Sequence, residues 1–481
     1  MSETGRHTVG RWIRDRARAT PGRVAVDYED RLVTYGELDA GSDALAARFD
    51  EAGLRRGDRV ATLTGNTPEH VQVFFACAKA GLILVPLSWR LTAPELQYQL
   101  ADSEPSVFLV EDDFVELAQQ TSWPFERPVP GTASPNQVPA VDVLDDDGLL
   151  LIYTSGTTGK PKGALLTHAN CFWTNLSLDL TTPMAEDDVV LQVLPQFHCG
   201  GWNVQPLLAW WKGARVVLER GFDAGRVLEL IERKRVTTVM GVPAIYLFLA
   251  QHPRFADADL CSVQRAVVGG APMPESLLET WAERGITVVQ GYGLTEAAPN
   301  VLCLPPEDAA RKIGFAGKPY PFVDVGLSAD GELLVRGPNV FPGYWRNPEA
   351  TAAAFTDDGR LRTGDVAECD DEGFYRIKGR LKEMYISGGE NVYPAEVEAA
   401  LHEHPHVSDA AVVGVPDDRW GEVGAAYVVA NGVSADELLA WCESRLARFK
   451  VPKSIHFVGE IPRNSMGKVQ KQELGERELA R

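Results

Sequence analysis

The stretch LLLIYTSGTTGKPKGALLT, residues 149–167, decides how the chain is organised, because a polar loop separates two apolar segments. The first apolar segment runs from Leu149 to Ile152, and the composition of Ala164 to Thr167 predicts a strand. The loop between them, residues 153–163, is rich in hydroxyl groups, glycines and lysines. The sequence therefore predicts a polar loop that leads from an apolar segment into a strand.

The composition of residues 153–163 is suited to holding phosphate groups. Glycines allow backbone N–H groups to turn inward, and hydroxyl groups add donors that can surround a polyphosphate. The loop supplies these hydroxyl and ammonium groups: Thr154, Ser155, Thr157, Thr158, Lys160 and Lys162. It is not a Walker A loop, because Pro161 follows Lys160 where that motif has Ser or Thr. Taken alone, its composition fits an ordinary polar turn between strands equally well.

Strand and helix patterns alternate on both sides of this loop. Before it, they predict a helix at Tyr35 to Glu51, a strand at Arg59 to Leu63, a helix from Pro68 and a strand at Ile83 to Pro86. After it, they predict strands at Asp188 to Pro195, Ala214 to Leu218, Thr238 to Val242, Arg265 to Val268 and Thr287 to Gln290, with helices between them. This alternation predicts an α/β fold with a mostly parallel sheet covered by helices on both faces.

The last third of the chain has a different pattern. Short strands with DG and GP turns between Ile313 and Phe374 predict a small β subdomain. Further on, predicted strands at Ala410 to Val415 and Gly424 to Val429 and a helix at Ala435 to Ala447 indicate a compact α+β unit of about 100 residues. We therefore predict an N-terminal domain, residues 1–381, and a small C-terminal lid, residues 382–481.

Composition and charge exclude several classes of partner. The net charge of −20 argues against nucleic acid and against an anionic membrane surface, since both call for a basic face. The most apolar segment, Val71 to Leu87, contains Lys79 and Gly81 and is too short to span a bilayer, so we expect a buried helix and strand there and no integral membrane association. The seven cysteines lack a metal-binding spacing, and no apolar segment follows the basic N-terminal residues, so we expect a cytoplasmic protein.

Seven motifs occur in order along the chain, and together they resemble the adenylate-forming superfamily. They are YTSGTTGKPKG from Tyr153, LPQFHCGG from Leu194, GGAPMP from Gly269, QGYGLTE from Gln290, RTGD ending at Asp365, GRLK from Gly379, and GK at Gly467 and Lys468. One such motif would be weak evidence, whereas seven in order are specific. The stretches ISGGENVYPAEVE and PRNSMGKVQK are most similar to those of stand-alone acyl-CoA synthetases, also called acyl-CoA ligases.

The resemblance implies a reaction in two steps, with ATP, Mg²⁺ and CoA as its cofactors and co-substrates. A carboxylic acid first attacks the α-phosphorus of ATP, which gives an acyl-adenylate and pyrophosphate. The thiol of CoA then displaces AMP. Phosphoryl chemistry of this kind depends on positioning and on neutralising charge around phosphorus, which the residue types of the motifs can supply.

The resemblance also implies which residues bind the nucleotide. They are Thr154, Ser155, Gly156, Thr157, Thr158, Gly159, Lys162, Gln290, Gly291, Tyr292, Thr295, Asp365, Arg380 and Lys468. Glu296 matches the Mg²⁺ ligand, and a hard cation is usually held by a carboxylate together with substrate phosphates. Asp365 matches the carboxylate that accepts hydrogen bonds from both ribose hydroxyls. Lys468 matches the lysine that bridges the substrate carboxylate and the α-phosphate, and it forms the implied catalytic set with Arg380, Glu296 and His198.

Three further sites follow from the resemblance. The acyl pocket is assigned to His198, Gly200, Gly201, Trp202, Gly270 and Ala297, the CoA-binding segment to Ser387, Gly388 and Gly389, and the hinge of the lid to Lys382. For Trp202, gating of the pocket and ordinary core packing are equally good interpretations. A thiol nucleophile formed by Cys199 beside His198 is disfavoured, because neighbours in sequence rarely point at one reacting atom.

The substrate is predicted to be a hydrophobic carboxylic acid, because the implied pocket wall is small and apolar. A medium- or long-chain fatty acid and an aryl acid of the cinnamate type both remain open. Amino-acid activation is disfavoured, because His198 stands where that branch of the superfamily has a carboxylate. The alternatives are an enzyme that loads a separate carrier protein, a non-catalytic nucleotide-binding protein and a luciferase-like oxygenase. A homodimer is left open.

Overall fold

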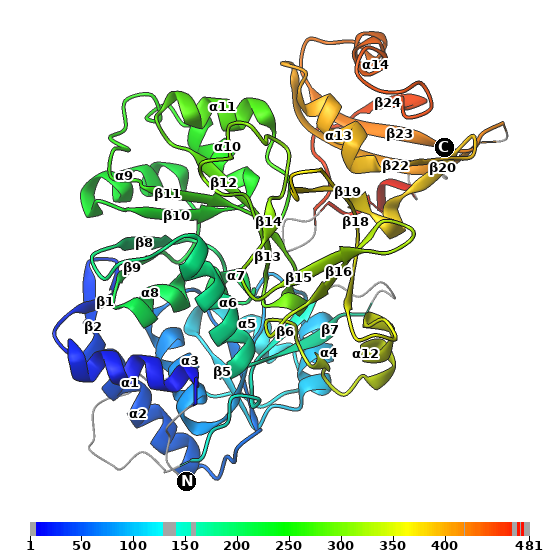
Figure 1. Ribbon diagram of the computed structural model, residues 1–481. Helices are drawn as coiled ribbons and strands as arrows, with labels where there is room; N and C mark the ends of the chain where they lie inside the picture. The colour runs from blue at the N-terminus through cyan, green and yellow to red at the C-terminus, as the bar shows by residue number, and fades with distance from the viewer. Residues whose placement is uncertain are drawn as a thin grey trace.

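A computed structural model of the chain describes residues 6–127, 141–154, 160–417, 419–463, 469–471 and 473–475. Two open sheets form its larger, N-terminal part (Figure 1). The first is six-stranded in the order β17-β7-β6-β4-β3-β5. Its strands are β3 (Arg59–Leu63), β4 (Ile83–Pro86), β5 (Val107–Val110), β6 (Gly148–Thr154), β7 (Lys162–Thr167) and β17 (Gly343–Tyr344). The stretch of residues 149–167 therefore forms the antiparallel hairpin β6–β7, while β6, β4, β3 and β5 run parallel.

The second sheet is nine-stranded in the order β14-β13-β12-β11-β10-β8-β9-β1-β2. Its strands are β1 (Val24–Tyr28), β2 (Arg31–Thr34), β8 (Val189–Gln192), β9 (Arg215–Leu218), β10 (Thr238–Gly241), β11 (Arg265–Val268), β12 (Val288–Gly293), β13 (Asn300–Cys303) and β14 (Lys318–Pro319). The run from β12 to β1 is parallel. The expected α/β fold with a mostly parallel sheet is thereby confirmed.

The alternation along the chain did not reveal which strands share a sheet. The hairpin β1–β2 belongs to the second sheet, because Val26 and Asp27 of β1 pair with β9. Strand β17 lies far along the sequence, yet it closes the edge of the first sheet by pairing with β7. Long-range pairings of this kind leave no local pattern in the sequence.

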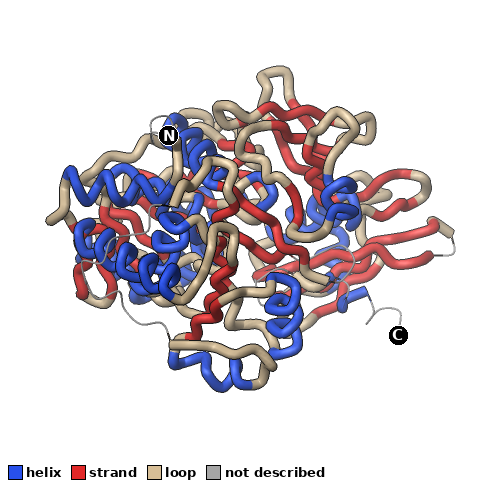
Figure 2. The backbone as a smooth tube through the Cα atoms, turned by 90° about the horizontal axis from the view of Figure 1, so that it is seen from below, coloured by secondary structure: helices blue, strands red, loops and turns tan. Residues whose placement is uncertain are grey.

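Helices fill three layers around the two sheets (Figures 1 and 2). Because successive strand residues point to opposite faces, Val60 and Val190 enter the core shared by both sheets, whereas Ala61 and Leu191 enter the two outer cores. The shared core contains α1 (Val9–Ala19), α2 (Tyr35–Glu51), α3 (Pro68–Ala80), α6 (His168–Thr181) and α8 (Pro206–Lys212). The outer cores contain α4 (Ala93–Ser103) and α5 (Val115–Gln119) on the first sheet, and α9 (Ala224–Lys234), α10 (Pro243–Gln251) and α11 (Glu275–Glu283) on the second.

Helix α3 is buried over most of its surface, which explains its largely apolar sequence. It packs inside the shared core, and even Lys79 has a side chain that is 0% exposed. The Lys79 ammonium is satisfied there by Asp39 at 2.5 Å and Asp43 at 2.6 Å. The prediction of a buried helix and strand over this apolar segment is confirmed, and within the described ranges no helix is both long and apolar enough to cross a membrane.

The predicted β subdomain and C-terminal α+β unit follow. The subdomain is the four-stranded sheet β15 (Asp324–Leu327), β16 (Glu332–Arg336), β18 (Leu361–Cys369) and β19 (Tyr375–Arg380), with α12 (Pro348–Ala354) beside it. The C-terminal sheet contains β20 (Tyr385–Ser387), β21 (Glu390–Val392), β22 (Val407–Asp417), β23 (Gly421–Ala430) and β24 (Ser454–Phe457), covered by α13 (Pro394–His402) and α14 (Ala435–Glu443).

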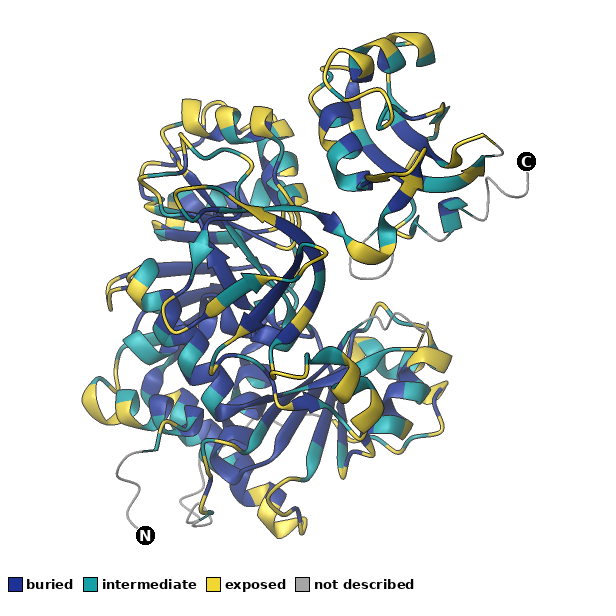
Figure 3. Cartoon of the chain, turned by 45° about the vertical axis from the view of Figure 1, so that its right-hand side comes forward, coloured by how far each residue is buried: buried dark blue, intermediate teal, exposed yellow. Residues whose placement is uncertain are grey.

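The C-terminal unit has a hydrophobic core of its own, formed by Tyr385, Leu401, Val412 and Leu438 among others. It stands at one end of the molecule (Figure 3). The 3₁₀ turn η3 (Leu381–Glu383) directly follows β19 and leads into this unit. The division into 1–381 and 382–481 stays a prediction. Helix α14 ends four residues before the predicted Ala447, and the N–H of Arg445 donates to the carbonyl of Cys442, three residues back, in the tighter turn that follows the helix.

A buried histidine joins the first helix to the shared core. His168 at the start of α6 is 0% exposed, and its Nδ1 accepts a hydrogen bond of 3.1 Å from the backbone N–H of Val9. Burial lowers the pKa of His168 to about 4. An unfolded histidine titrates near 6.5, so the unfolded chain binds a proton here that the folded chain excludes. The free energy of unfolding therefore falls as pH drops from about 6.5 to 4.

Replacing His168 with Asn tests this dependence, because the Asn carbonyl can accept from Val9 and does not titrate. We expect the slope of unfolding free energy against pH in this window to decrease by about 1.4 kcal/mol per pH unit, the value for one proton. Urea unfolding at a series of pH values measures it. The matched control is His252→Asn, since His252 accepts a similar bond from Arg254 N–H at the surface. Equal slopes for wild type and His168→Asn would contradict the expectation.

Candidate active site

The base of the polar loop is held by the β6–β7 hairpin. Thr154 pairs with Lys162 across the ladder, and the Thr154 hydroxyl donates to the carbonyl of Lys162 at 3.4 Å. The ammonium of Lys162 lies 5.2 Å from the ring centre of Tyr344, and that of Lys160 lies 5.8 Å from the ring of Tyr98. The predicted loop residues Ser155, Gly156, Thr157, Thr158 and Gly159 lie outside the described residues.

Glu296 lies beside this base although it comes from the second sheet. It belongs to the 3₁₀ turn η2 (Thr295–Ala297), which follows β12. The hydroxyl of Tyr344 donates to Glu296 Oε1 at 2.7 Å, and no described residue donates to Oε2. Burial and the neighbouring carboxylate both raise the pKa of Tyr344, which keeps the phenol protonated as a donor. Thr295, next to Glu296, is half-buried.

Asp365 joins three elements at a second polar centre. It is 3% exposed, and it lies opposite Arg380 in the ladder of β18 and β19. Its Oδ1 accepts from Arg380 Nε at 2.7 Å, and its Oδ2 accepts from the hydroxyl of Tyr292 at 2.5 Å. Burial, followed by the charge of Asp365, raises the pKa of Tyr292 well above its ordinary value. The structure thus brings together three predicted nucleotide residues from β12, β18 and β19.

The end of β12 is fixed before it reaches Tyr292. The side-chain amide of Gln290 accepts a hydrogen bond from the backbone N–H of Met273 at 3.3 Å and donates one to the backbone carbonyl of Phe315 at 3.4 Å. Gly291 follows, and Gly269 lies across the sheet from it, where an added Cβ would come within 3.3 Å of the Gly291 carbonyl. Gly270 has φ +83°, in the left-handed region that favours glycine. Gly269 and Gly270, which follow β11, therefore lie beside Gly291 near the carboxyl end of β12, and ligands bind at such strand ends in open α/β sheets.

His198 is the polar group of the predicted acyl pocket. It lies in the loop after β8, and its ring is 4.6 Å from that of Phe197. Burial, with a smaller contribution from Arg90, lowers the pKa of His198 to about 4, so the imidazole is neutral at pH 7. Burial raises the pKa of the adjacent Cys199 thiol, which therefore stays protonated. This agrees with the argument against a thiol nucleophile.

Trp202 has the environment of a core residue. It is 0% exposed, it stacks on Phe74 of α3 at 4.5 Å, and its indole N–H donates to the carbonyl of Gln196 at 2.6 Å. Gly201 is required by close packing, because an added Cβ would lie 2.3 Å from the Pro195 carbonyl oxygen, whereas one on Gly200 would make only ordinary contacts, at 3.8 Å from Leu194 and 3.9 Å from Val204. Ala297 is likewise buried in the shared core. A role for these residues in the acyl pocket stays a prediction.

The predicted CoA segment forms the turn between β20 and β21. Ser387 is buried, and Gly388 and Gly389 have φ +61° and +89°. An added Cβ on Gly388 would lie 2.9 Å from the Trp420 ring, whereas Gly389 faces open space. The predicted hinge residue Lys382 is exposed in η3. Lys468 lies outside the described residues, so its position relative to the site stays a prediction.

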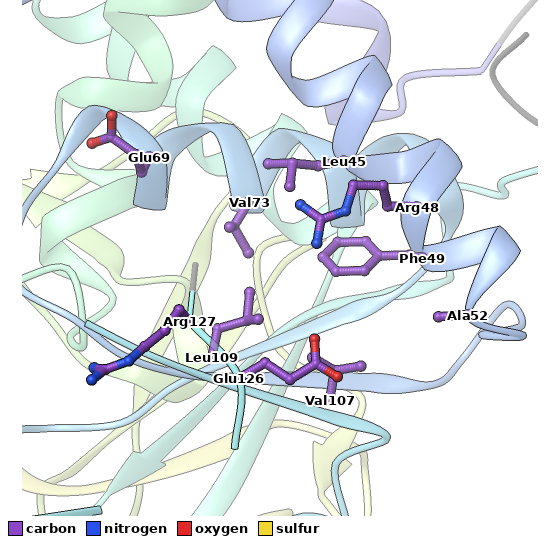
Figure 4. Close-up of a pocket in the computed structure, with 10 residues that line it drawn as sticks. All are labelled: Leu45, Arg48, Phe49, Ala52, Glu69, Val73, Val107, Leu109, Glu126 and Arg127. Atoms are coloured by element: carbon purple, nitrogen blue, oxygen red, sulfur yellow. The ribbon is translucent and has the colours of Figure 1, made fainter. Parts of the chain in front are cut away.

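Sequence reasoning missed two supporting residues. Tyr344 contacts Glu296, and Glu332 is a buried acid that accepts from Gly364 N–H at 3.0 Å and so supports the turn before Asp365. Neither lies in a motif that was singled out. A surface pocket between α2, α3 and β5 shares no residue with the predicted site (Figure 4). In the part of the chain that the structure describes, no group of three or more His, Cys, Asp or Glu could hold a metal ion.

Comparison with known protein families decides the class. The model of the AMP-binding enzyme family matches residues 13–345, and that of the AMP-binding enzyme C-terminal domain matches residues 396–468. The chain belongs to the AMP-binding enzyme family. This confirms the expectation of an enzyme of the adenylate-forming superfamily, similar to acyl-CoA synthetases.

Curated relatives of this AMP-binding enzyme match over nearly their full lengths. A feruloyl-CoA synthase from an Amycolatopsis species is 44% identical over 98% of this chain and 99% of that protein. An indoleacetate–CoA ligase from Aromatoleum aromaticum is 40% identical over 97% of each chain. A long-chain-fatty-acid–CoA ligase from Mycobacterium tuberculosis is 38% identical over 97% of this chain and 98% of that protein. The solved structure of ATP-bound MatB from Rhodopseudomonas palustris superimposes with a TM-score of 0.89 at 32% identity, covering 98% and 99% of the two chains.

Replacing Asp365 with Asn tests the second polar centre in this AMP-binding enzyme. The side-chain amide of Asn has one acceptor oxygen where the carboxylate has two. It therefore cannot accept hydrogen bonds from Tyr292 and Arg380 and also from the ribose hydroxyls. We expect the affinity for AMP, measured by titration calorimetry, to fall by about 10- to 100-fold, since hydrogen bonds to charged groups contribute roughly 1.5–3 kcal/mol. Asp188→Asn is the control, because Asp188 is also buried and is paired with Arg265 at 2.7 Å, but it lies directly before β8 of the second sheet. Unchanged AMP affinity in Asp365→Asn would exclude Asp365 from the nucleotide site.

Proposed function

We propose that this AMP-binding enzyme is an ATP-dependent acid–CoA ligase whose substrate is an aryl acid of the cinnamate type. The observation that carries the proposal is the 44% identity to a feruloyl-CoA synthase across 98% of the chain. The second relative, an indoleacetate–CoA ligase, also has an aryl acid in its name. Both relatives are named as enzymes that form a CoA thioester, which favours CoA over a carrier protein as the acyl acceptor. A fatty acid is the alternative, supported by the 38% identical long-chain ligase.

The nucleotide would lie between Asp365 and the base of the polar loop. Asp365 would accept the ribose hydroxyls, because each carboxylate oxygen can accept more than one hydrogen bond. Arg380 is half-exposed, so its guanidinium can also reach phosphate oxygens. Lys162 and the loop residues Ser155, Gly156, Thr157, Thr158 and Gly159 would hold the β- and γ-phosphates, with Thr154 at the base.

Mg²⁺ fits Glu296 on chemical grounds. The carboxylate has one oxygen bound by Tyr344 and a second to which no described residue donates, and hard cations prefer such oxygens together with substrate phosphates. When bound, Mg²⁺ would offset negative charge on the triphosphate. Thr295, adjacent to Glu296, would face the α-phosphate.

The acid would lie beside His198. Because its imidazole is neutral at pH 7, His198 can donate a hydrogen bond that orients the substrate carboxylate without a permanent charge. Gly200 and Gly270 carry no side chain, so a pocket wall that they form would leave room for a flat aryl group. An amino acid would need a carboxylate in the pocket to pair with its ammonium group. His198 stands at that position instead, so we expect an amino acid to be a poor substrate.

The lid would serve the two steps in turn. Lys468 would stabilise the charge that develops at the α-phosphate during adenylation, and rotation about Lys382 would replace it with the turn of Ser387, Gly388 and Gly389 for thioester formation. Neither glycine carries a side chain, so a ligand could approach the backbone of that turn closely. We further propose a cytoplasmic enzyme, whereas its assembly state, including a homodimer, stays open.

The substrate class is tested by a panel of acids with ATP, Mg²⁺ and CoA. The panel contains ferulate, coumarate, indoleacetate and fatty acids of six to sixteen carbons (roughly the range that an apolar pocket of ordinary size admits). Mass spectrometry of the acyl-CoA products gives kcat/KM for each acid. We expect the hydroxycinnamates to exceed every fatty acid by about tenfold or more, a difference of about 1.4 kcal/mol in transition-state binding. A fatty acid with the highest kcat/KM would overturn the aryl assignment.

The division of labour in the lid is tested by measuring the two half-reactions separately. Lys468→Ala should lower pyrophosphate release from acid and ATP by about 100-fold or more, the scale of losing one electrostatic contact to the transition state. It should spare CoA transfer from supplied acyl-adenylate. Gly389→Leu should show the reverse pattern.

The control for Gly389→Leu is Gly432→Leu, because Gly432 has φ +71° elsewhere in the C-terminal unit and suffers similar backbone strain. We expect it to preserve both half-reactions. Equal loss of both half-reactions in Lys468→Ala would refute its assigned role, and normal thioester output from Gly389→Leu would refute the CoA assignment.

A further inference from the structure

We infer that Tyr344 is a positioning residue that fixes the carboxylate of Glu296 for metal binding and couples it to the base of the polar loop. The inference rests on the proposed function, because the metal role of Glu296 is part of that proposal. It assigns a role to a residue that the motifs did not single out.

Strand β17 is only two residues long, but it is fixed from both sides. Gly343 and Tyr344 pair antiparallel with Leu165 and Ala164 of β7, and Trp345 N–H donates to the Gly163 carbonyl at 2.7 Å. On the other side, the N–H of Tyr344 donates to the Thr351 hydroxyl at 2.9 Å. The strand therefore keeps a constant register with β7, which carries Lys162 at its start.

The same segment holds Glu296 by its backbone and by its side chain. The N–H of Phe341 donates to the Glu296 carbonyl at 2.9 Å, and the hydroxyl of Tyr344 donates to Glu296 Oε1 at 2.7 Å. The ring of Phe341 packs edge-on against that of Tyr344, with centroids 5.0 Å apart and planes at 81°. Residues 341–344 thus leave the Glu296 carboxylate little freedom to rotate.

The phenol ring of Tyr344 contacts charges of both signs. Its hydroxyl binds the Glu296 carboxylate, and the Lys162 ammonium lies 5.2 Å from its ring centre, within the range of cation–π attraction. A carboxylate held through one oxygen presents the other to a cation in a defined direction. Ordering the ligand in advance reduces the entropy lost when the metal binds. Tyr344 would therefore strengthen Mg²⁺-dependent binding of ATP without touching the nucleotide.

Titration calorimetry of ATP binding at a series of Mg²⁺ concentrations tests this role in the full chain. Tyr344→Phe keeps the ring and the contact with Lys162 but removes the hydroxyl. We expect the Mg²⁺ concentration for half-maximal ATP binding to rise about 10-fold or more, the usual effect of losing a group that orients a metal ligand. ATP binding without Mg²⁺ should change by less than about twofold, because the lost hydrogen bond acts on the metal ligand alone.

The matched control is Tyr246→Phe, which removes a buried hydroxyl that donates to the Val267 carbonyl at 2.9 Å in the outer core of the second sheet. A purely structural effect would lower the thermal midpoint of both variants and leave the Mg²⁺ dependence of both unchanged. An unshifted Mg²⁺ dependence in Tyr344→Phe overturns the inference.

Glu296→Gln separates failure of this inference from failure of the proposed function. If Glu296→Gln weakens Mg²⁺-dependent ATP binding and Tyr344→Phe does not, the positioning role alone is wrong. If Glu296→Gln also leaves the Mg²⁺ dependence unchanged, the metal role proposed for Glu296 is wrong, and the inference falls with it. A shift in both variants supports the two assignments together.

Discussion

The pairing of β7 with β6 on one side and β17 on the other is the constraint on which the site depends. β6 and β7 hold the two ends of the polar loop, and β17 brings Tyr344 against Glu296 from the second sheet. Two sheets that share one helical core would otherwise place the loop and Glu296 on separate layers. This short edge pairing connects the predicted phosphate loop to the predicted metal ligand.

A buried carboxylate plays the same part at the other end of the site. Asp365 lies where β12, β18 and β19 meet, and its partners Tyr292 and Arg380 come from two of those strands. Burying a carboxylate is costly unless both oxygens are paired, so the arrangement is stable only when all three strands are in register. The nucleotide would therefore bind to groups that folding has already ordered, while the lid carries the residues that must exchange between steps.

Local patterns in the sequence predicted the elements well. The strands Arg59–Leu63, Ile83–Pro86 and Arg265–Val268 and the helix Tyr35–Glu51 were predicted to the residue, because the strands are short apolar segments and the helix has a clear start signal. Thr34 and Glu37, for example, form a capping box at the start of that helix. The motif order likewise predicted the family. These are properties of short segments, in which neighbouring residues determine the outcome.

Long-range contacts could not be predicted in this way. No local signal places β1 and β2 in the second sheet or β17 beside β7, and so Tyr344 was missed. For Trp202, the sequence left core packing and pocket gating open, and only its stacking on Phe74 shows the buried environment. Lys468 was predicted from its motif alone, and it lies outside the described residues.

The central claim is that an aryl acid is activated by ATP in this site. Exchange of labelled pyrophosphate into ATP tests it most directly, because the exchange requires reversible formation of the acyl-adenylate and no CoA. The account predicts exchange that depends on both ferulate and Mg²⁺ and that is lost in Asp365→Asn. Absence of exchange with every aryl acid, in enzyme that still binds AMP, would contradict it.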